Sequence, residues 1–70
     1  MSREIIMKQG NAYMFVCREG YKIRAVYDKP VYVGTEYFIR VNTLTYDNRV
    51  EDEPEFINPL QVIKMYRINM

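Results

Sequence analysis

Apolar and polar side chains alternate along residues 13–27, YMFVCREGYKIRAVY, with the period of two that is typical of β-strands. The run divides at Gly20, a residue that readily adopts the positive φ angles of tight turns. The pattern therefore predicts a β-hairpin, and the length of its loop decides which side chains share a face.

Two registers are open to this hairpin. With a two-residue loop, Phe15 lies opposite Arg24, and rings and cations share one face that would suit single-stranded nucleic acid. With a three-residue loop, residues 18–20, Phe15 lies opposite Ile23 and the rings share an apolar face. We favour the second register, because a two-residue loop needs a positive φ at Glu19, at a cost of about 1 kcal/mol.

Further strands are predicted on both sides of the hairpin. Residues 4–8, EIIMK, form a first strand followed by a turn at 9–11, and DKP at 28–30 marks a second turn. A short strand at 31–33 and a kink or bulge at Gly34 lead into a long strand over 36–46. Its period of two assigns one face to the core, with the side chains of Tyr37, Ile39, Val41, Thr43 and Thr45.

The C-terminal third divides into a charged segment and an apolar one. Residues 47–56, DNRVEDEPEF, break the alternation and are predicted to form a long surface loop. In the segment after it, Asn58 and Pro59 are helix-start signals, but residues 62–68, VIKMYRI, favour a strand. We expect a short helical turn near 59–61 followed by a strand at 62–68, with a full C-terminal helix as the alternative.

These elements predict an all-β fold in a single domain spanning residues 1–70. Five or six short strands suggest an SH3-like or related small curled barrel, because closing a sheet removes its edges. The alternative is an antiparallel meander packed against a C-terminal helix. Such small folds carry many unrelated activities, so the fold does not predict the function.

Composition adds limits rather than an identity. The 49% hydrophobic content excludes a disordered chain, and no segment approaches the length of a membrane span. A single cysteine, Cys17, forbids an intramolecular disulfide and suits a reducing, cytoplasmic setting. The net charge of +1 selects no partner, although residues 47–56 are strongly acidic within a mildly basic chain.

The residue types of catalysis are largely missing. The chain has no histidine, and Ser2 at the terminus is its one serine, so a Ser-His-Asp arrangement is impossible. Cys17 has no histidine to activate it and is expected to be a buried structural residue. The carboxylates of EDEPE lack the spacing of a calcium loop. We expect no enzyme activity, no metal site and no cofactor.

The chain is instead expected to bind another macromolecule, first of all a protein with a basic surface. The predicted contact residues are the acidic side chains of the 47–56 segment with an aromatic residue at each end, namely Tyr46, Asp47, Glu51, Asp52, Glu53, Glu55 and Phe56. Seven tyrosines are more than a small core absorbs, and exposed tyrosine favours interfaces or a homodimer.

We therefore expect a stoichiometric regulator, inhibitor or assembly accessory. Its size and lack of catalytic residues would suit a phage or mobile-element accessory protein. The alternative is a nucleic-acid-binding small barrel in which Lys22, Arg24 and Arg40 contact phosphates. Neither reading places the chain in a membrane.

Overall fold

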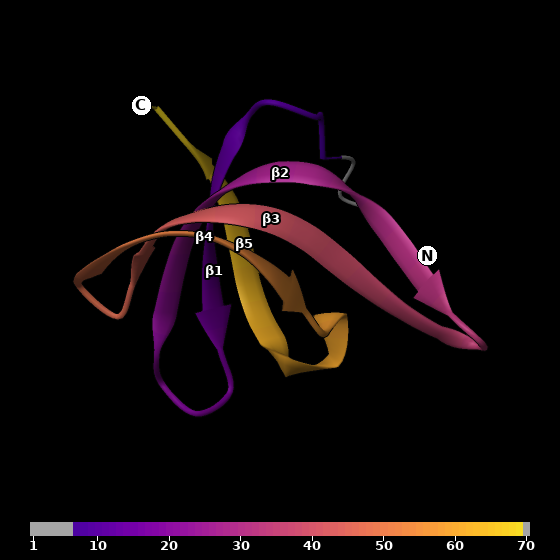
Figure 1. The fold of residues 1–70 in the computed structure, drawn as a ribbon. Helices are drawn as coiled ribbons and strands as arrows, with labels where there is room; N and C mark the ends of the chain where they lie inside the picture. Colours follow the sequence, from indigo (N-terminus) through magenta and orange to yellow (C-terminus); the bar gives the residue numbers. More distant parts are fainter. Residues whose placement is uncertain (1–6, 70) are drawn as a thin grey trace.

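A computed structural model describes residues 7–69 of the chain, and their strands form one antiparallel sheet (Figure 1). The elements in chain order are β1 (Ala12–Cys17), β2 (Lys22–Val33), β3 (Glu36–Tyr46), β4 (Arg49–Ile57), η1 (Pro59–Gln61) and β5 (Val62–Ile68). The η1 element is a single turn of 3₁₀ helix. The strand order in the sheet is β4-β3-β2-β1-β5. The all-β prediction is confirmed, and the C-terminal helix of the alternative is wrong because residues 62–68 form β5.

The predicted register of the β1–β2 hairpin is confirmed. Phe15 lies opposite Ile23. The loop is closed by two backbone hydrogen bonds, from the Cys17 N–H to the Tyr21 carbonyl and from the Gly20 N–H to the Cys17 carbonyl, both 3.0 Å. Gly20 has a φ of 94°, which a residue with a Cβ rarely adopts. The loop therefore has three residues, and the rings of the hairpin face the core.

The predicted turn at residues 28–30 is wrong, because β2 continues through Pro30 to Val33. Strand pairing with β1 ends at Val26, and Tyr27 forms backbone hydrogen bonds with Gly10 and Asn11 just before β1. Beyond Tyr27, β3 is the one strand among the described residues that pairs with β2. A proline is tolerated in a strand segment whose other side is not paired. The chain turns instead at residues 34–35, where Gly34 has a φ of 63°. The predicted kink or bulge at Gly34 is thus a two-residue hairpin turn.

Strand β3 contributes the middle of the core face that its alternation predicts, whereas Tyr37 is 37% exposed and Thr45 is half-buried. Ile39, Val41 and Thr43 are buried. The pairing with both neighbouring strands shifts between Thr43 and Thr45. On the β4 side the extra residue belongs to β4, because Glu51 and Asp52 together lie opposite Leu44. On the β2 side Leu44 is itself the extra residue of β3. This bulge ends the alternation, and it is Tyr46 that pairs with the buried Ile23.

The predicted loop at residues 47–56 is wrong as well. Asp47 and Asn48 have φ angles of 49° and 73°, as the two central residues of a type I′ hairpin turn require. The chain then returns as β4 along the edge of the sheet. Acidic side chains and Pro54 are typical of an edge strand, where they discourage pairing with other chains.

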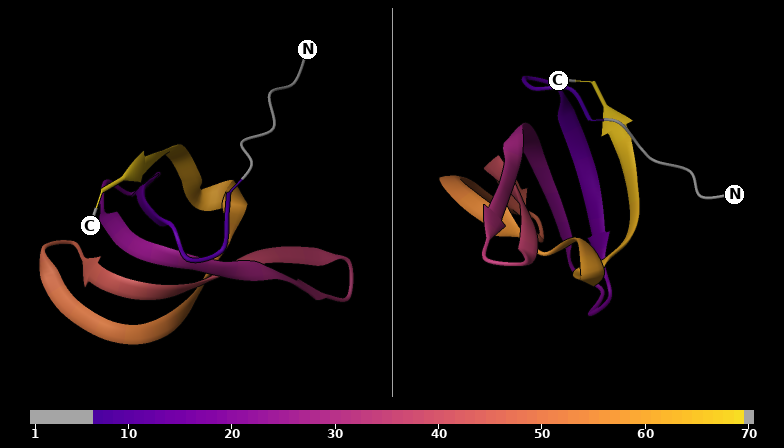
Figure 2. Two further views of the ribbon diagram at one scale, coloured as in Figure 1. Left: turned by 90° about the horizontal axis from the view of Figure 1, so that it is seen from above. Right: turned by 90° about the vertical axis from the view of Figure 1, so that its right-hand side faces the viewer.

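The helical turn predicted at residues 59–61 is confirmed as η1. The Asn58 side chain accepts a hydrogen bond from the Leu60 N–H at 3.0 Å, and Pro59 begins the turn. Strand β5 then pairs with β1, with Met65 opposite Phe15. In Figure 2 (right) the sheet bends, so that β1 and β5 lie on one side of the core and β3 and β4 on the other.

The strand predicted at residues 4–8 lies partly outside the described residues. Met7 and Lys8 are not in a strand, whereas the turn predicted after them is present. It is closed by a hydrogen bond from the Asn11 N–H to the Lys8 carbonyl, at 3.1 Å. The described sheet therefore has five strands.

The core contains one buried polar side chain, that of Thr43, among the described residues. Thr43 is 0% exposed, and its Oγ1 has no hydrogen-bond partner among the described residues. Burying an unpaired hydroxyl costs free energy, so Thr43→Val should stabilise the fold by about 1 kcal/mol. Urea denaturation measures this change. Thr45→Val, the same substitution at a half-buried position of β3, is the matched control and should change stability by less. Equal effects at both positions would contradict the assignment.

Candidate protein-binding surface

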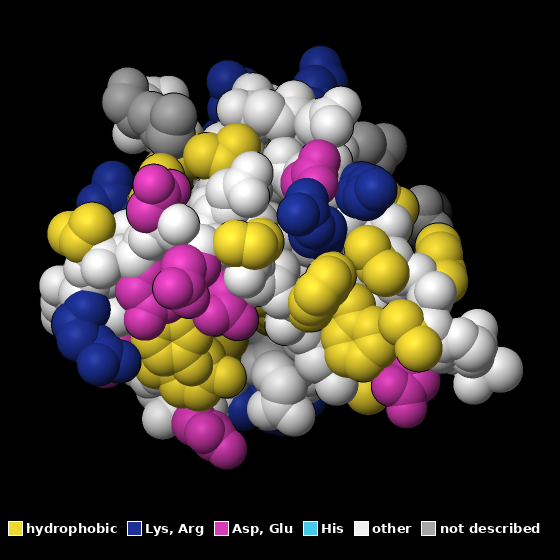
Figure 3. Space-filling view, in the orientation of Figure 1, with side chains coloured by type: hydrophobic (Ala, Val, Ile, Leu, Met, Phe, Trp, Pro, Cys, Tyr) yellow, Lys and Arg dark blue, Asp and Glu magenta, His cyan; other side chains and the backbone are white. Residues whose placement is uncertain are grey.

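The predicted acidic residues lie together along the exposed edge strand β4 and the turn before it. Asp47, Asp52 and Glu53 are exposed, and Glu51 and Glu55 are half-buried. Figure 3 shows acidic side chains grouped over this part of the sheet. We call these five residues the acidic edge. Four of its five carboxylates are held on a strand, which positions them more precisely than the predicted loop would.

The two aromatic residues predicted to flank the acidic residues are not brought together. The ring of Tyr46 stacks on that of Tyr21, with centroids 5.3 Å apart and planes 16° apart, on the face that pairs with Ile23. Phe56 pairs with Arg40 on the opposite face. Arg49 is the partner of Tyr46 on β4, and Phe56 lies seven residues beyond it, which is about 23 Å along an extended strand. The two aromatic side chains are therefore far apart.

Phe56 belongs instead to an exposed apolar patch on the outer face of the sheet. Its side chain is 59% exposed. The register places it diagonal to Phe38, which pairs with Val31. Val33 follows at the end of β2 and is 61% exposed. We call these four side chains, Val31, Val33, Phe38 and Phe56, the outer patch. Hydrophobic side chains gather at the right of Figure 3, toward the end of the β2–β3 hairpin.

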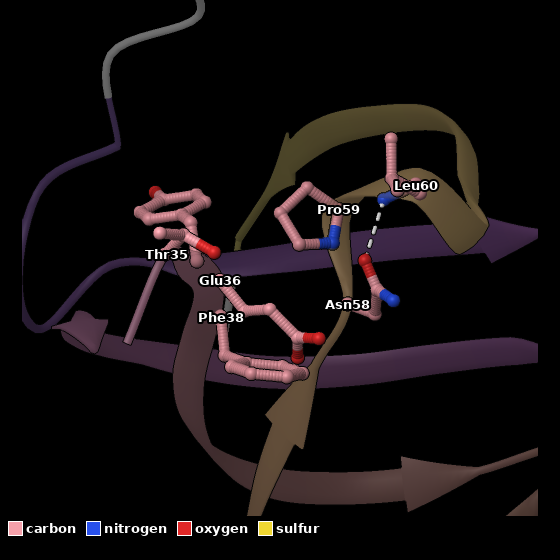
Figure 4. A pocket seen from close by; sticks show the side chains of 7 residues that line it. Thr35, Glu36, Phe38, Asn58, Pro59 and Leu60 are labelled. Carbon is pink, nitrogen blue, oxygen red and sulfur yellow. Dashed lines mark hydrogen bonds between the residues drawn. The ribbon is translucent and has the colours of Figure 1, made fainter. Parts of the chain in front are cut away.

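The sequence did not predict a groove that begins where β4 ends. Two hollows of about 410 and 300 Å³ share Tyr37 and Pro59 in their lining. Figure 4 shows the first of them, between the start of β3 and the η1 turn. Leu60 lines the first hollow and is 74% exposed, and Ile63 lines the second and is 60% exposed. The groove is formed by residues more than twenty positions apart, so no local pattern reveals it.

The acidic edge and the groove are continuous along the chain. Strand β4 ends at Ile57, and Asn58, Pro59 and Leu60, the next three residues, line the first hollow. Glu36 lines the same hollow and adds a carboxylate to it. A partner that contacts both features would therefore carry cations beside apolar side chains.

The three predicted phosphate contacts do not form one patch. Lys22 and Arg24 are exposed on the outer face opposite Val16 and Met14, as the favoured register predicts. Arg40 lies opposite Lys29, about 16 Å further along β2 from Arg24.

Arg40 is already engaged within the fold. Its guanidinium forms an ion pair with Asp28, and Gln9 Nε2 donates to the other Asp28 carboxylate oxygen at 3.1 Å. The hydrogen bond from Gln9, together with Arg40, holds the pKa of Asp28 below its ordinary value. A phosphate would have to compete with this carboxylate for Arg40.

The pKa values of Cys17 and Tyr21, at the two ends of the β1–β2 loop, are both raised. Cys17 is 1% exposed, and burial raises the pKa of its thiol, so the reactive thiolate is disfavoured. Burial raises the pKa of Tyr21 to about 12. Within residues 7–69, no three His, Cys, Asp or Glu side chains are placed so that they could hold one metal ion.

Comparison of the chain with known protein families, curated proteins and solved structures found no match. Among the described residues, no helix has the length and apolar character needed to cross a membrane.

The Asp28–Arg40 pair makes a prediction about pH. Because the folded pKa of Asp28 is lowered, its contribution to stability is complete above the unfolded pKa of about 3.9 and is lost as the pH falls through the folded value. Asp28→Asn should therefore destabilise the protein at pH 7, and the difference from wild type should shrink in acid. Urea denaturation at pH 7 and at a pH below about 3.9 measures the difference in unfolding free energy.

Arg40→Gln is the control, since it removes one partner of Asp28 and leaves Gln9 in place. Its destabilisation should follow the same pH pattern with a smaller amplitude. A difference between Asp28→Asn and wild type that is the same at both pH values would contradict the prediction.

Proposed function

We propose that the chain is a non-enzymatic protein-binding module that acts by stoichiometric docking, as a regulator, inhibitor or assembly accessory. The observation that carries this proposal is the continuity of the acidic edge with the apolar groove along one border of the sheet. Exposed carboxylates beside exposed apolar side chains suit a protein partner with a basic and apolar contact surface.

In this proposal each feature has a separate role. Asp47, Glu51, Asp52, Glu53 and Glu55 orient a basic partner, since complementary charge mainly sets encounter and register. Leu60 and Ile63 then receive its apolar side chains, and burial of apolar area supplies the affinity. Phe56 contributes from the outer patch, whereas Tyr46 supports the turn through its stack on Tyr21.

We also propose that the sheet is related to the SH3-like small barrels. The return of β5 to pair with β1, directly after the η1 turn, supports this relation. The bend that sets β1 and β5 against β3 and β4 supports it as well (Figure 2). A relation between folds does not predict which partner the chain binds.

Nucleic-acid binding is the weaker proposal. Lys22 and Arg24 are exposed where a phosphate could reach them, but the ion pair with Asp28 occupies Arg40. Such binding would fall steeply as salt rises and would disappear after nuclease treatment.

Charge reversal tests the acidic edge directly. The immobilised chain should capture a protein from native cell lysate that nuclease does not release. The variant E51K/D52K/E53K should bind this protein, once purified, at least about tenfold more weakly, because like charges then face its basic surface.

The matched control K22Q/R24Q removes two charges from the outer face and should retain the partner. An unchanged affinity in the acidic-edge variant would remove the acidic edge from the proposal. Nuclease-sensitive capture that K22Q/R24Q abolishes would favour nucleic acid instead.

A further inference from the structure

The sheet has two edges, and within residues 7–69 no strand pairs with the outer side of either β4 or β5. Each edge presents backbone N–H and C=O groups that a strand of another molecule can pair with. The two strands have comparable lengths of nine and seven residues.

The two edges carry opposite charge. Strand β4 has four carboxylates and one guanidinium, a net charge of −3, and β5 has Lys64 and Arg67, a net charge of +2. Pairing β4 with β4, or β5 with β5, between two molecules therefore places like charges together, which is unfavourable. Pairing β4 of one molecule with β5 of another is the combination in which the charges attract.

The same two edges expose large apolar side chains. On β4, Val50 and Phe56 are 86% and 59% exposed, and on β5, Ile63 and Tyr66 are 60% and 43% exposed. Strand pairing would bring such side chains beside those of the neighbouring molecule and remove part of them from water. Pro54 lacks an N–H, so β4 offers one backbone donor fewer than its length allows.

We propose that a second copy of this chain pairs its β5 edge with the β4 edge of the first. The contact joins two different surfaces, so each copy keeps one edge free for the next. Such head-to-tail contacts build a ring when the rotation closes and a filament when it does not. The assembly uses the acidic edge, so it competes with the outside partner proposed above, but it does not depend on that partner.

Sedimentation velocity of the full chain over a range of concentrations and salt tests this proposal. Wild type should self-associate, more weakly at high salt. The variant K64E/R67E reverses the charge of β5, and E51K/D52K/E53K reverses that of β4. Each variant alone has two edges of like charge and should self-associate at least about tenfold more weakly.

Mixing the two variants is the decisive measurement. In an equimolar mixture every β4–β5 contact between unlike variants again joins opposite charges, so assembly should be restored. The control K22E/R24E makes the same change of charge as the β5 variant on β2, where β1 and β3 pair on either side, and should assemble like wild type.

Three results would overturn the proposal: wild type monomeric at every concentration, single-edge variants that assemble unchanged, or a mixture that stays monomeric. Circular dichroism confirms that each variant is folded. Arg67→Glu separates the two proposals, because Arg67 lines neither hollow of the groove. With the acidic edge and the groove intact, this variant should still capture the outside partner while its self-association is weakened. If no outside partner exists, sedimentation alone still decides the question of assembly.

Discussion

The pairing of Phe15 with Ile23 is the contact on which the rest of the structure depends. It turns Tyr13, Phe15 and Cys17 inward together, and it places Met65 of β5 against the same ring from the other side. A slip of one residue would exchange the two faces of β2 and bring Lys22 and Arg24 toward the core. Gly20 selects the register, because its positive φ closes the three-residue loop without strain on its neighbours. The hairpin is therefore a structural core and not a stacking platform.

Features set by neighbouring residues were predictable from the sequence, and features set by distant ones were not. The hairpin register, the core face of β3 and the cap at Asn58 all follow from local chemistry. The passage of β2 through Pro30 depends on where β1 stops pairing, which no local pattern records. Strand β4 was misread for a different reason, since charges and a proline mark loops as well as edge strands. The signal for it was present in Asp47–Asn48, two residues that tolerate left-handed conformations.

In the candidate surface, too, features set by neighbouring residues were predictable and features set by distant residues were not. The acidic residues lie together along β4 and the turn before it, but the change from loop to strand separates Tyr46 and Phe56 onto opposite faces and distant positions. The groove arises because β4 ends at Ile57 and leaves the start of β3 open to the η1 turn (Figure 4). Tyr37 and Pro59 meet there only after β3, β4 and β5 are in place. Sequence therefore identified the charge of the surface, while tertiary structure determined its shape.

The open sheet gives the charges of β4 two physical roles at once. An edge strand with apolar exposed side chains is prone to pair with any other strand, and a run of carboxylates makes pairing between two such edges unfavourable. The repulsion is selective, because it acts against another acidic edge and not against a basic one. The carboxylates that discourage pairing between two acidic edges are thus, in both proposals, the residues that select the partner. A basic, apolar strand meets this requirement, and β5 of the chain itself is such a strand. In the proposed function, protection of the edge and recognition at the edge are one electrostatic property.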